Sequence, residues 1–201
     1  NSEEAKNMLL ELEKFKNLTN LNNGQVQNED IVFTCPPYAA YEFNEDLYDI
    51  KGMGGSETAL IEVARNLKKI TGRTVKIFCV REHDQVLVSK SGVEYISNRF
   101  LNEYLSKNLP RVHIAWRHNI KVTNAPTYLW CHDLFTQGVE TQHNFDKILC
   151  LTQFHKNYVM AKQNVPEEKI VVTRNGLDIQ KFLFPVREKN PNKLVYMSSP
   201  D

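Results

Sequence analysis

The sequence predicts an α/β fold, a Rossmann-like parallel sheet with helices on both faces, preceded by an N-terminal helix. Short apolar and β-branched runs are nearly continuous rather than alternating, as in strands that are covered on both faces. Segments of helical periodicity lie between these runs, and this βαβ alternation is typical of doubly wound folds. The expected strands are residues 31–35, 75–80, 93–97, 112–116, 127–131, 147–151 and 169–173, and the expected helices are 56–70, 98–108 and 152–163.

The elements follow one another along the chain. The first strand, IVFTC, leads through a long polar and aromatic loop, 36–53, into a helix with apolar residues at helical spacing: Leu60, Val63, Ala64, Leu67 and Ile70. The strands VKIFCV and VEYIS precede a second helix with the stripe Phe100, Leu101, Tyr104 and Leu105. VHIAW, TYLWC and KILCL precede a third helix with the weaker stripe Phe154, Tyr158, Val159 and Ala161, and KIVVT is the last expected strand.

Three parts are expected along the chain. Residues 1–29 combine a charged helical pattern with a polar linker, residues 30–190 form the Rossmann-like domain, and residues 191–201 are typical of the truncated start of a second nucleotide-binding domain. The leading helix could end an upstream module or dock on the domain behind it. Because the chain starts with Asn1 and stops within an expected strand and its exit loop, we expect upstream and downstream domains in a longer chain.

Composition excludes several classes of partner. The net charge of +1 gives no electrostatic reason to expect a nucleic-acid partner. The longest apolar runs fall well short of the ~20 residues that a membrane span needs, and no secretory signal is visible, so we expect a cytoplasmic protein. The cysteines lack CxxC and zinc-ligand spacing, which predicts reduced, buried thiols and no metal site: Cys35, Cys79, Cys131 and Cys150.

Residues 51–58 read KGMGGSET and place two adjacent glycines at the start of the first helix. Ligands of open α/β sheets bind at the carboxyl ends of the strands, where this loop lies. Gly54 and Gly55 lack Cβ atoms and let backbone N–H groups approach a ligand, and Ser56 is the expected N-cap. Glu57 already uses part of the positive potential of the first turn, so we expect a neutral sugar or a shared phosphate here. A plain structural turn is the alternative.

Polar residues also follow three other expected strands. His132 and Asp133 end the strand TYLWC, and the imidazole could donate a hydrogen bond to a sugar hydroxyl or stabilise charge. The alternatives are a histidine that caps the next helix or pairs with Asp133. Arg117 follows VHIAW on the same rim, with a solvated surface residue as the alternative. Asn175 and Gly176 follow KIVVT, where a plain tight turn is the alternative.

The other histidines have structural interpretations. His118 shares the rim position of Arg117 and the same solvated alternative. His155, with Lys156, is expected on an exposed helix face. The remaining histidines show no partner at metal-ligand spacing and are predicted to be structural: His83, His113 and His143.

The order of these motifs resembles the amino-terminal domain of GT-B glycosyltransferases, in particular the large retaining family 4. The residues that carry the resemblance are GGSE, WCHD, CLTQFHKNYV, KIVVTRNGLDIQKF and KLVYMSSPD, within roughly residues 30–201. Each motif alone is modest, whereas five in the right order form a more specific set. In such enzymes two Rossmann-like domains face each other across a cleft, and the amino-terminal domain holds mostly the acceptor.

The resemblance implies roles for individual residues. Gly54 and Gly55 would lie against the donor phosphate or sugar, together with Ser56. His132 would be the catalytic residue that contacts the transferred sugar and helps stabilise its oxocarbenium-like transition state. The other implied substrate-binding residues are Arg117, Asp133, Asn175 and Gly176. A nucleotide sugar would be the co-substrate, a glycan or other hydroxyl compound the acceptor, and no metal or further cofactor is expected.

The resemblance also implies that this chain holds half of an active site. The diphosphate-binding Arg or Lys and the paired glutamates of the family lie in the second domain, so we expect little or no transferase activity from the chain alone. Two other functions are open at this point. One is a non-catalytic Rossmann-like module that binds a glycan or a protein. The other is a nucleotide-sugar epimerase or a phosphorylase of the same two-domain architecture.

Overall fold

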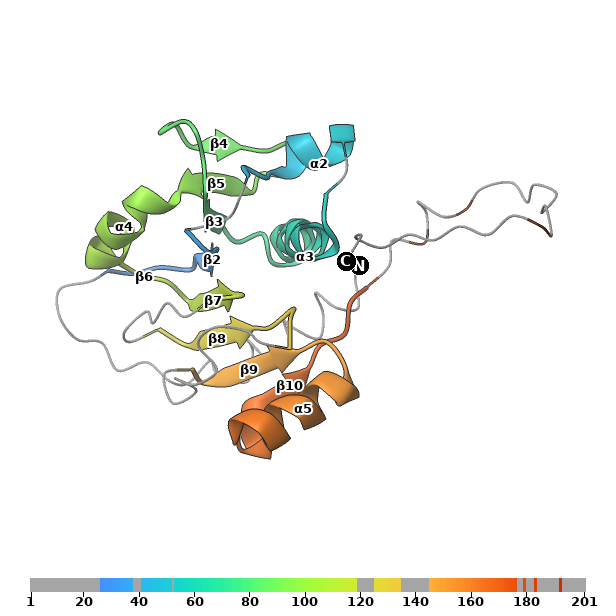
Figure 1. The fold of residues 1–201 in the computed structure, drawn as a ribbon. Helices are drawn as coiled ribbons and strands as arrows, with labels where there is room; N and C mark the ends of the chain where they lie inside the picture. The colour runs from blue at the N-terminus through green and yellow to red at the C-terminus, as the bar shows by residue number, and fades with distance from the viewer. Residues whose placement is uncertain are drawn as a thin grey trace.

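The computed structural model describes residues 26–37, 41–51, 53–118, 125–134, 145–176, 179, 183 and 192. Within these residues eight strands form one sheet, in the order β10-β9-β8-β7-β2-β3-β5-β4 (Figure 1). Its strands are β2 (Ile31–Thr34), β3 (Val75–Cys79), β4 (Leu87–Val88), β5 (Glu94–Ser97), β7 (Val112–Trp116), β8 (Thr127–Trp130), β9 (Lys147–Cys150) and β10 (Ile170–Val172). All neighbours pair in parallel except β4 with β5. The predicted α/β class is confirmed, and the sheet is compatible with a Rossmann-like fold.

Helices cover both faces of the sheet, as predicted. The described helices are α2 (Glu45–Lys51), α3 (Gly55–Thr71), α4 (Leu101–Lys107) and α5 (Gln153–Gln163), with 3₁₀ turns at Asn98–Phe100 and Glu167–Lys169. Successive strand residues point to opposite faces, so Phe33 packs with α3 whereas Val32 packs with α4. Ala115, on the same face as Val32, packs with α5. Figure 1 shows α3 and α4 on opposite sides of β2 and β3.

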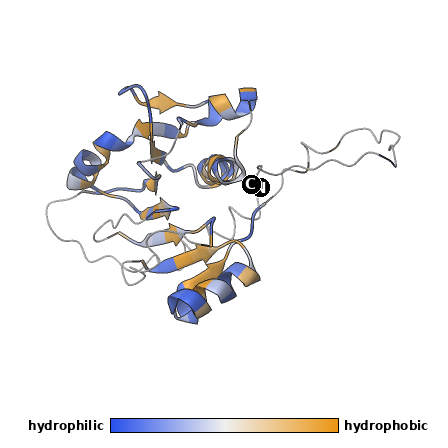
Figure 2. Cartoon of the chain, in the orientation of Figure 1, coloured by the Kyte–Doolittle hydropathy of each residue, from blue (hydrophilic) through white to orange (hydrophobic). Residues whose placement is uncertain are grey.

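α3 is the longest described helix and carries the main core. Its buried residues recur at helical spacing and lie against the strands: Leu60, Ile61, Val63, Ala64 and Leu67. Burying each large apolar side chain contributes roughly 2 kcal/mol, so this face supplies much of the stability. The helix ends at Gly72, whose φ of 67° is the left-handed conformation of a C-cap and whose N–H donates to the Lys68 carbonyl. Figure 2 shows hydrophobic residues along the strands and hydrophilic ones over much of α4.

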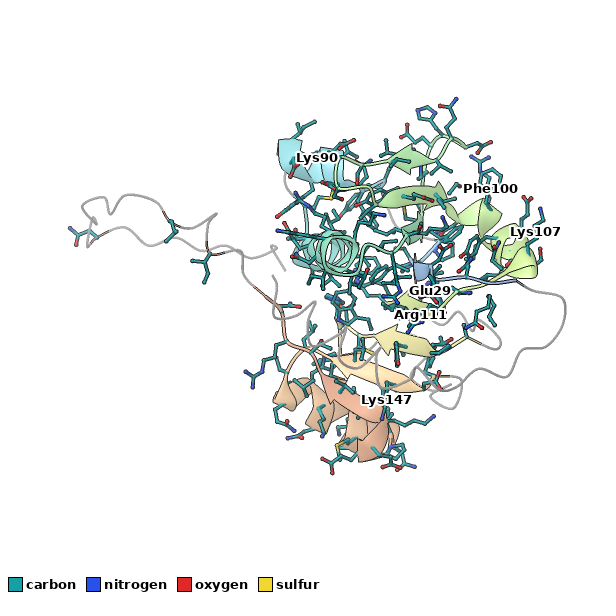
Figure 3. The ribbon with its side chains drawn as sticks, turned by 180° about the vertical axis from the view of Figure 1, so that it is seen from behind. Glu29, Lys90, Phe100, Lys107, Arg111 and Lys147 are labelled. Atoms are coloured by element: carbon teal, nitrogen blue, oxygen red, sulfur yellow. The ribbon has the colours of Figure 1, made fainter. Side chains whose placement is uncertain are left out.

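The last residues of the segment 1–29, predicted as a helix and a polar linker, pack on the domain. β1 (Val26–Gln27) pairs in parallel with β6 (Asn108–Leu109) in a separate two-stranded sheet. Glu29 then accepts hydrogen bonds from Arg73 Nε at 2.8 Å and from Arg111 Nη1 at 3.2 Å, and Figure 3 shows Glu29 beside Arg111. The linker prediction is therefore wrong for residues 26–29. A polar segment held by backbone and ionic bonds has no apolar periodicity to reveal it, and the expected N-terminal helix lies outside the described residues.

α2 is a second correction, because the sequence predicts a loop over residues 36–53. The Asn44 side chain caps this helix, since its Oδ1 accepts a hydrogen bond from the Leu47 N–H at 2.9 Å. Glu45 and Asp46 then occupy the first turn. An asparagine followed by two acidic residues is an ordinary helix-start signal that the sequence carries. The short edge strand β4 was also not predicted, since two residues give no periodicity.

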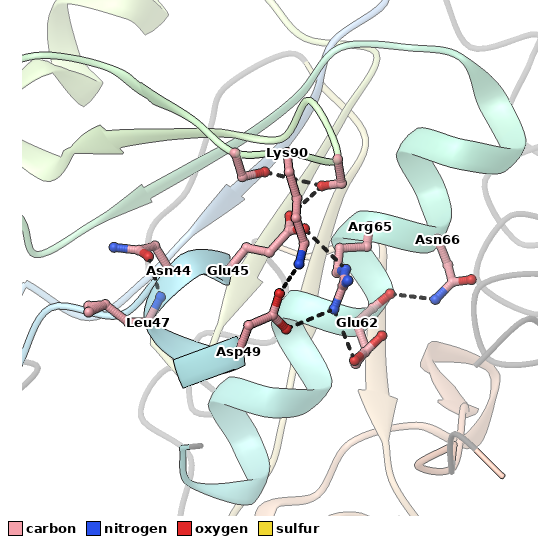
Figure 4. Close-up of polar contacts among 10 residues, drawn as sticks. Asn44, Glu45, Leu47, Asp49, Glu62, Arg65, Asn66 and Lys90 are labelled. Atoms are coloured by element: carbon pink, nitrogen blue, oxygen red, sulfur yellow. Dashed lines mark hydrogen bonds and ion pairs between the residues drawn. The ribbon is translucent and has the colours of Figure 1, made fainter. Parts of the chain in front are cut away.

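A buried carboxylate fixes α2 on the rest of the domain (Figure 4). Glu45 is fully buried, lies 3.4 Å from Arg65 Nε on α3, and accepts a hydrogen bond from the Ser91 hydroxyl before β5. Asp49, one turn later, pairs with Arg65 at 3.8 Å and with Lys90. Removing one partner of a buried ion pair is strongly destabilising, because the other charge stays uncompensated. These contacts set where the chain leaves α2 and approaches α3.

The four cysteines are buried and free, as predicted. Burial raises the pKa of Cys79 to about 12, and it raises the pKa of Cys150 to about 12 as well. Thiols of this kind are protonated and unreactive at neutral pH. None of the helices in the described part of the chain is long and apolar enough to cross a membrane.

Candidate functional site

Three parts of the fold meet at one edge of the sheet: the start of α3 and the segments that follow β7 and β8. β7 and β8 are parallel neighbours in which Trp116 is the partner of Trp130. The Arg117 N–H donates to the Trp130 carbonyl at 3.0 Å, so the residue that leaves β7 is fixed against the end of β8. Both strands end here with their carboxyl ends, where open α/β sheets bind their ligands.

The Arg117 side chain joins two of these parts. Its Nε donates to Asp133 Oδ2 at 2.8 Å, and its Nη2 lies 2.8 Å from the same oxygen. Its Nη1 donates to Ser56 Oγ at 3.3 Å and lies 3.8 Å from Glu57 Oε1. The guanidinium also lies over the Trp116 ring, 5.2 Å from its centroid. Arg117 is thus partly exposed, at 31%, and is also held by side chains of two other segments.

The backbone of Arg117 supports a special role for this position. Its φ is 60°, in the left-handed region that residues other than glycine rarely adopt. Such a conformation costs on the order of 1–3 kcal/mol and persists only where the surroundings determine it. Here the hydrogen bond to Trp130 and the ion pair with Asp133 hold the residue in place. Strain of this kind is frequent at ligand sites.

The start of α3 differs from the predicted arrangement. The N-cap is Gly54 and not Ser56, and no side chain caps it. The Ser56 hydroxyl donates instead to Glu57 Oε2 at 3.0 Å. A Cβ on Gly54 would lie only 2.4 Å from that same oxygen, so the missing side chain leaves room for the Glu57 carboxylate. A Cβ on Gly55 would meet no atom within 4 Å, and Gly55 is exposed.

Glu57 has a further partner in Tyr41. Burial raises the Tyr41 pKa, and the nearby Glu57 carboxylate, which accepts a hydrogen bond from the phenol, raises it further. The carboxylate therefore has contacts with Tyr41, Ser56 and Arg117 at the first turn of α3. A negative charge at this place is stabilised by the free N–H groups of a helix start.

His132 lies against two tryptophan rings. Its ring centroid is 4.7 Å from that of Trp130 and 6.0 Å from that of Trp116. Burial lowers the His132 pKa to about 4, Arg117 acts in the same direction, and Asp133 opposes them. Its Nε2 has no hydrogen-bond partner among the described residues. A neutral imidazole with an unused nitrogen is thus held between aromatic rings, rather than beneath aliphatic side chains.

His155 is a residue of this site that the sequence analysis assigned wrongly to an exposed face. It is only 5% exposed, and its backbone N–H donates to Thr152 Oγ1, the N-cap of α5, at 3.0 Å. Burial lowers its pKa, whereas a hydrogen bond from the ring to the Asp133 backbone and the Asp133 charge oppose that shift. Thr152, three residues earlier, is the N-cap signal that could have placed His155 at the helix start. Lys156 is half-buried and pairs with Glu167 at 2.8 Å.

A second pair of histidines lies between β2 and β7. His118, expected on the surface, is buried. Burial lowers its pKa to about 4, although a hydrogen bond with the Thr34 backbone acts in the opposite direction. His113 Nε2 lies 2.8 Å from Thr34 Oγ1, and burial lowers its pKa to about 3. The structural interpretation of His113 agrees with this packing. His83 is exposed, and His143 lies outside the described residues.

The structure brings five of these residues into one group, which we call the Arg117 cluster: Ser56, Glu57, Arg117, His132 and Asp133. Gly54 and Gly55 adjoin it at the start of α3. Asn175 and Gly176 are exposed after β10, which is separated from β8 by β9, and they lie at the same edge of the sheet as the cluster.

No group of three His, Cys, Asp or Glu side chains in the described part of the chain is arranged to hold a metal ion. Comparison of the sequence with protein-family models and with curated proteins finds no match. The function is therefore argued from the residues of the Arg117 cluster.

Proposed function

We propose that this chain is the acceptor-side half of a retaining GT-B glycosyltransferase, which transfers a sugar from a nucleotide-sugar donor to an acceptor hydroxyl. The observation that carries the proposal is the convergence of Arg117 on Ser56, Glu57 and Asp133, with the neutral His132 beside them. The motif order GGSE, WCHD and RNGLD, which resembles the retaining family, supports it independently.

The chemistry of the Arg117 cluster suits a sugar. Carboxylate oxygens accept hydrogen bonds from hydroxyl groups, and a guanidinium donates to them. The cluster has two carboxylates and one guanidinium, and its excess negative charge would favour the positive charge that develops in an oxocarbenium-like transition state. The neutral imidazole of His132, whose buried Nε2 has no partner among the described residues, lies beside these groups and adds no charge of its own.

The same charges argue that the donor diphosphate is held elsewhere. The only arginine in the cluster is already paired with Asp133 and lies near Glu57, so it offers little to a dianion. In the proposed enzyme a second domain holds the nucleotide and its diphosphate. The chain alone is then inactive, and closure of the two domains excludes water from the transfer step. The enzyme would act in the cytoplasm without a metal.

The test is to incubate the full-length protein with a panel of nucleotide sugars and acceptors and to follow release of free nucleotide. His132→Ala is expected to lower kcat about 100-fold, because an interaction made in the transition state is lost. His83→Ala, an exposed histidine between β3 and β4, is the matched control and keeps full activity. Consumption of no donor with any acceptor, or a His132→Ala enzyme as active as the wild type, contradicts the proposal.

A non-catalytic glycan-binding module is the second candidate function. The contacts among Arg117, Glu57 and Asp133 need no second domain to recognise hydroxyl groups. This candidate predicts glycan binding by the chain alone and no nucleotide release by the full-length protein. An epimerase of the same fold would instead convert the donor in the absence of any acceptor.

A further inference from the structure

We infer that the Arg117 cluster selects an uncharged sugar face and discriminates against sugar acids and sugar phosphates. This inference rests on the proposed function and specifies its substrate class. The cluster places one guanidinium between two carboxylates, Glu57 on one side and Asp133 on the other. An anionic group that enters between them meets like charge on both sides, and like-charge contacts are a strong means of rejecting a wrong ligand.

The start of α3 already holds a carboxylate, that of Glu57. The free N–H groups of a helix start normally favour an anion. In this helix the Glu57 carboxylate is only 13% exposed and lies where a Cβ of Gly54 would be. It therefore competes with an incoming anion for the same positive potential. A hydroxyl group, in contrast, can donate to the carboxylate and leave this arrangement intact.

The Arg117 guanidinium is already paired with Asp133. A ligand carboxylate or phosphate that pairs with the Nε and Nη2 edge of the guanidinium must displace Asp133, whose Oδ2 lies 2.8 Å from both nitrogens, and at Nη1 it meets Glu57. That exchange would leave the Asp133 carboxylate without its cation and beside a new negative charge. A neutral ligand needs no exchange, because its hydroxyl groups can donate to Asp133 and accept from Arg117 together.

The rings of Trp116 and Trp130 form an aromatic wall beside His132. Trp116 is 1% exposed, contacts both Arg117 and His132, and its Nε1 has no hydrogen-bond partner among the described residues. His132 is uncharged at neutral pH, because its pKa is lowered to about 4 by burial and by Arg117. Because both tryptophans and His132 Nε2 are buried, this wall contributes no positive charge that could pair with an anion.

The chain contains two tryptophans, Trp116 and Trp130, and both contact His132, which gives a direct measurement. The two indole N–H signals of the isotope-labelled 201-residue chain are followed by NMR during titration with matched methyl glycosides. The probes are the methyl glycosides of glucose, galactose and mannose and of the corresponding uronic acids, which differ from the hexosides only at C6. We expect at least one hexoside to shift an indole signal and its uronic acid to bind about tenfold more weakly or worse.

Two variants locate the discrimination. Glu57→Gln and Asp133→Asn each remove one negative charge, and we expect each to bring the uronic acid closer to the affinity of the hexoside. Glu103→Gln is the matched control, since Glu103 is an exposed carboxylate on α4 that pairs with Lys107 on the other face of the sheet. Thermal melting shows whether each variant is folded. If either Glu57→Gln or Asp133→Asn does not fold, the other variant alone carries the test.

The outcomes separate this inference from the proposed function. A uronic acid that binds as tightly as its hexoside overturns the inference and leaves sugar transfer standing. Indole signals that respond to none of the glycosides also overturn it, whereas the nucleotide-release assay decides separately whether the full-length protein is a transferase. An unchanged preference in both Glu57→Gln and Asp133→Asn shows that the discrimination arises elsewhere, and this too contradicts the inference.

Discussion

The strand β7 has an arginine at each end, and the two arginines have opposite surroundings. Arg111 precedes the strand and shares Glu29 with Arg73, so two cations surround one carboxylate. Arg117 follows the strand and shares its charge between Glu57 and Asp133, so two carboxylates surround one cation. We call the first group the Glu29 cluster. Both groups are made of ordinary ion pairs, and only their surroundings distinguish them.

The surroundings show that ion pairs alone do not mark a site. Glu29 is 60% exposed, and its neighbours are other solvated polar groups. The Arg117 cluster adds a positive φ, a neutral buried imidazole and tryptophan nitrogens without partners in the described residues. The Glu29 cluster holds the segment before β2 on the domain, whereas the Arg117 cluster leaves hydrogen-bonding capacity unused. Burial, backbone strain and unpartnered polar atoms together, and not charge, distinguish the Arg117 cluster from the Glu29 cluster.

The largest expected effect separates the two arginines by activity. In the full-length protein Arg117→Ala should lower kcat/KM about 100-fold or more, because Glu57 and Asp133 lose their shared cation and repel each other. Arg111→Ala should leave kcat/KM within about twofold and change the free energy of unfolding by less than about 1 kcal/mol. Nucleotide release and urea unfolding measure the two quantities. Equal losses of activity in both variants would remove the distinction drawn here.

Acid should affect His113 and the Glu29 cluster at different pH. Burial lowers the pKa of His113 to about 3, from the 6.5 of an accessible histidine. Between these values the unfolded chain binds a proton that the folded chain excludes, so stability falls as the pH falls. The expected loss through His113 is about 2 kcal/mol between pH 7 and pH 5. Urea unfolding at both pH values measures it, and His113→Gln should show a clearly smaller loss.

The Glu29 cluster provides the internal control for this pH dependence. The hydrogen bond from Arg73 lowers the Glu29 pKa below its ordinary 4.5, so the contribution of this carboxylate is present above that value. It is lost only as the pH falls through the lowered pKa, below the window from pH 7 to pH 5 in which the loss through His113 is measured. A stability loss between pH 7 and pH 5 that is unchanged in His113→Gln would show that His113 does not cause it.

The main elements could be predicted because their signals are local and repetitive. The predicted runs correspond to β2, β3, β5, β7, β8, β9 and β10 and are nearly continuously apolar, and the stripe of α3 repeats over 17 residues. α2 and β4 were missed because seven and two residues hold little periodicity. The linker residue Glu29 was missed because ionic contacts such as its pair with Arg73 join residues that are far apart in the chain.

The candidate site was predictable by position but not by contact. Arg117, His132 and Asp133 were found because polar residues at the carboxyl ends of parallel strands share one edge. The sequence could not show that Glu57 fills the space left by Gly54, since that depends on the rotamer of one side chain. His155 was misplaced because its stripe on α5 is weak, and the contact that buries it comes from the Asp133 segment.

A smaller effect is expected from the two glycines before the Arg117 cluster. Gly54→Ala places a Cβ on the Glu57 carboxylate and should displace that side chain, lowering kcat/KM several-fold with little loss of stability. Gly55→Ala meets no atom within 4 Å and should be neutral or stabilising by up to about 1 kcal/mol. Urea unfolding and kinetics of both variants provide the measurement. If Gly55→Ala raises KM while stability is kept, the open space beside Gly55 is where substrate lies.

The smallest expected effect concerns the Glu29 cluster itself. Glu29→Gln should lower the free energy of unfolding by about 0.5 kcal/mol at low salt, because an exposed ion pair is weakened by solvent and by side-chain entropy. The difference between variant and wild type should shrink as sodium chloride rises from 50 mM to 500 mM, since salt screens exposed charges. Urea unfolding at both salt concentrations measures it. A loss above about 2 kcal/mol that salt does not change would mean that Glu29 acts as a buried charge, and the amino-terminal end of β7 would then need the same scrutiny as its carboxyl-terminal end.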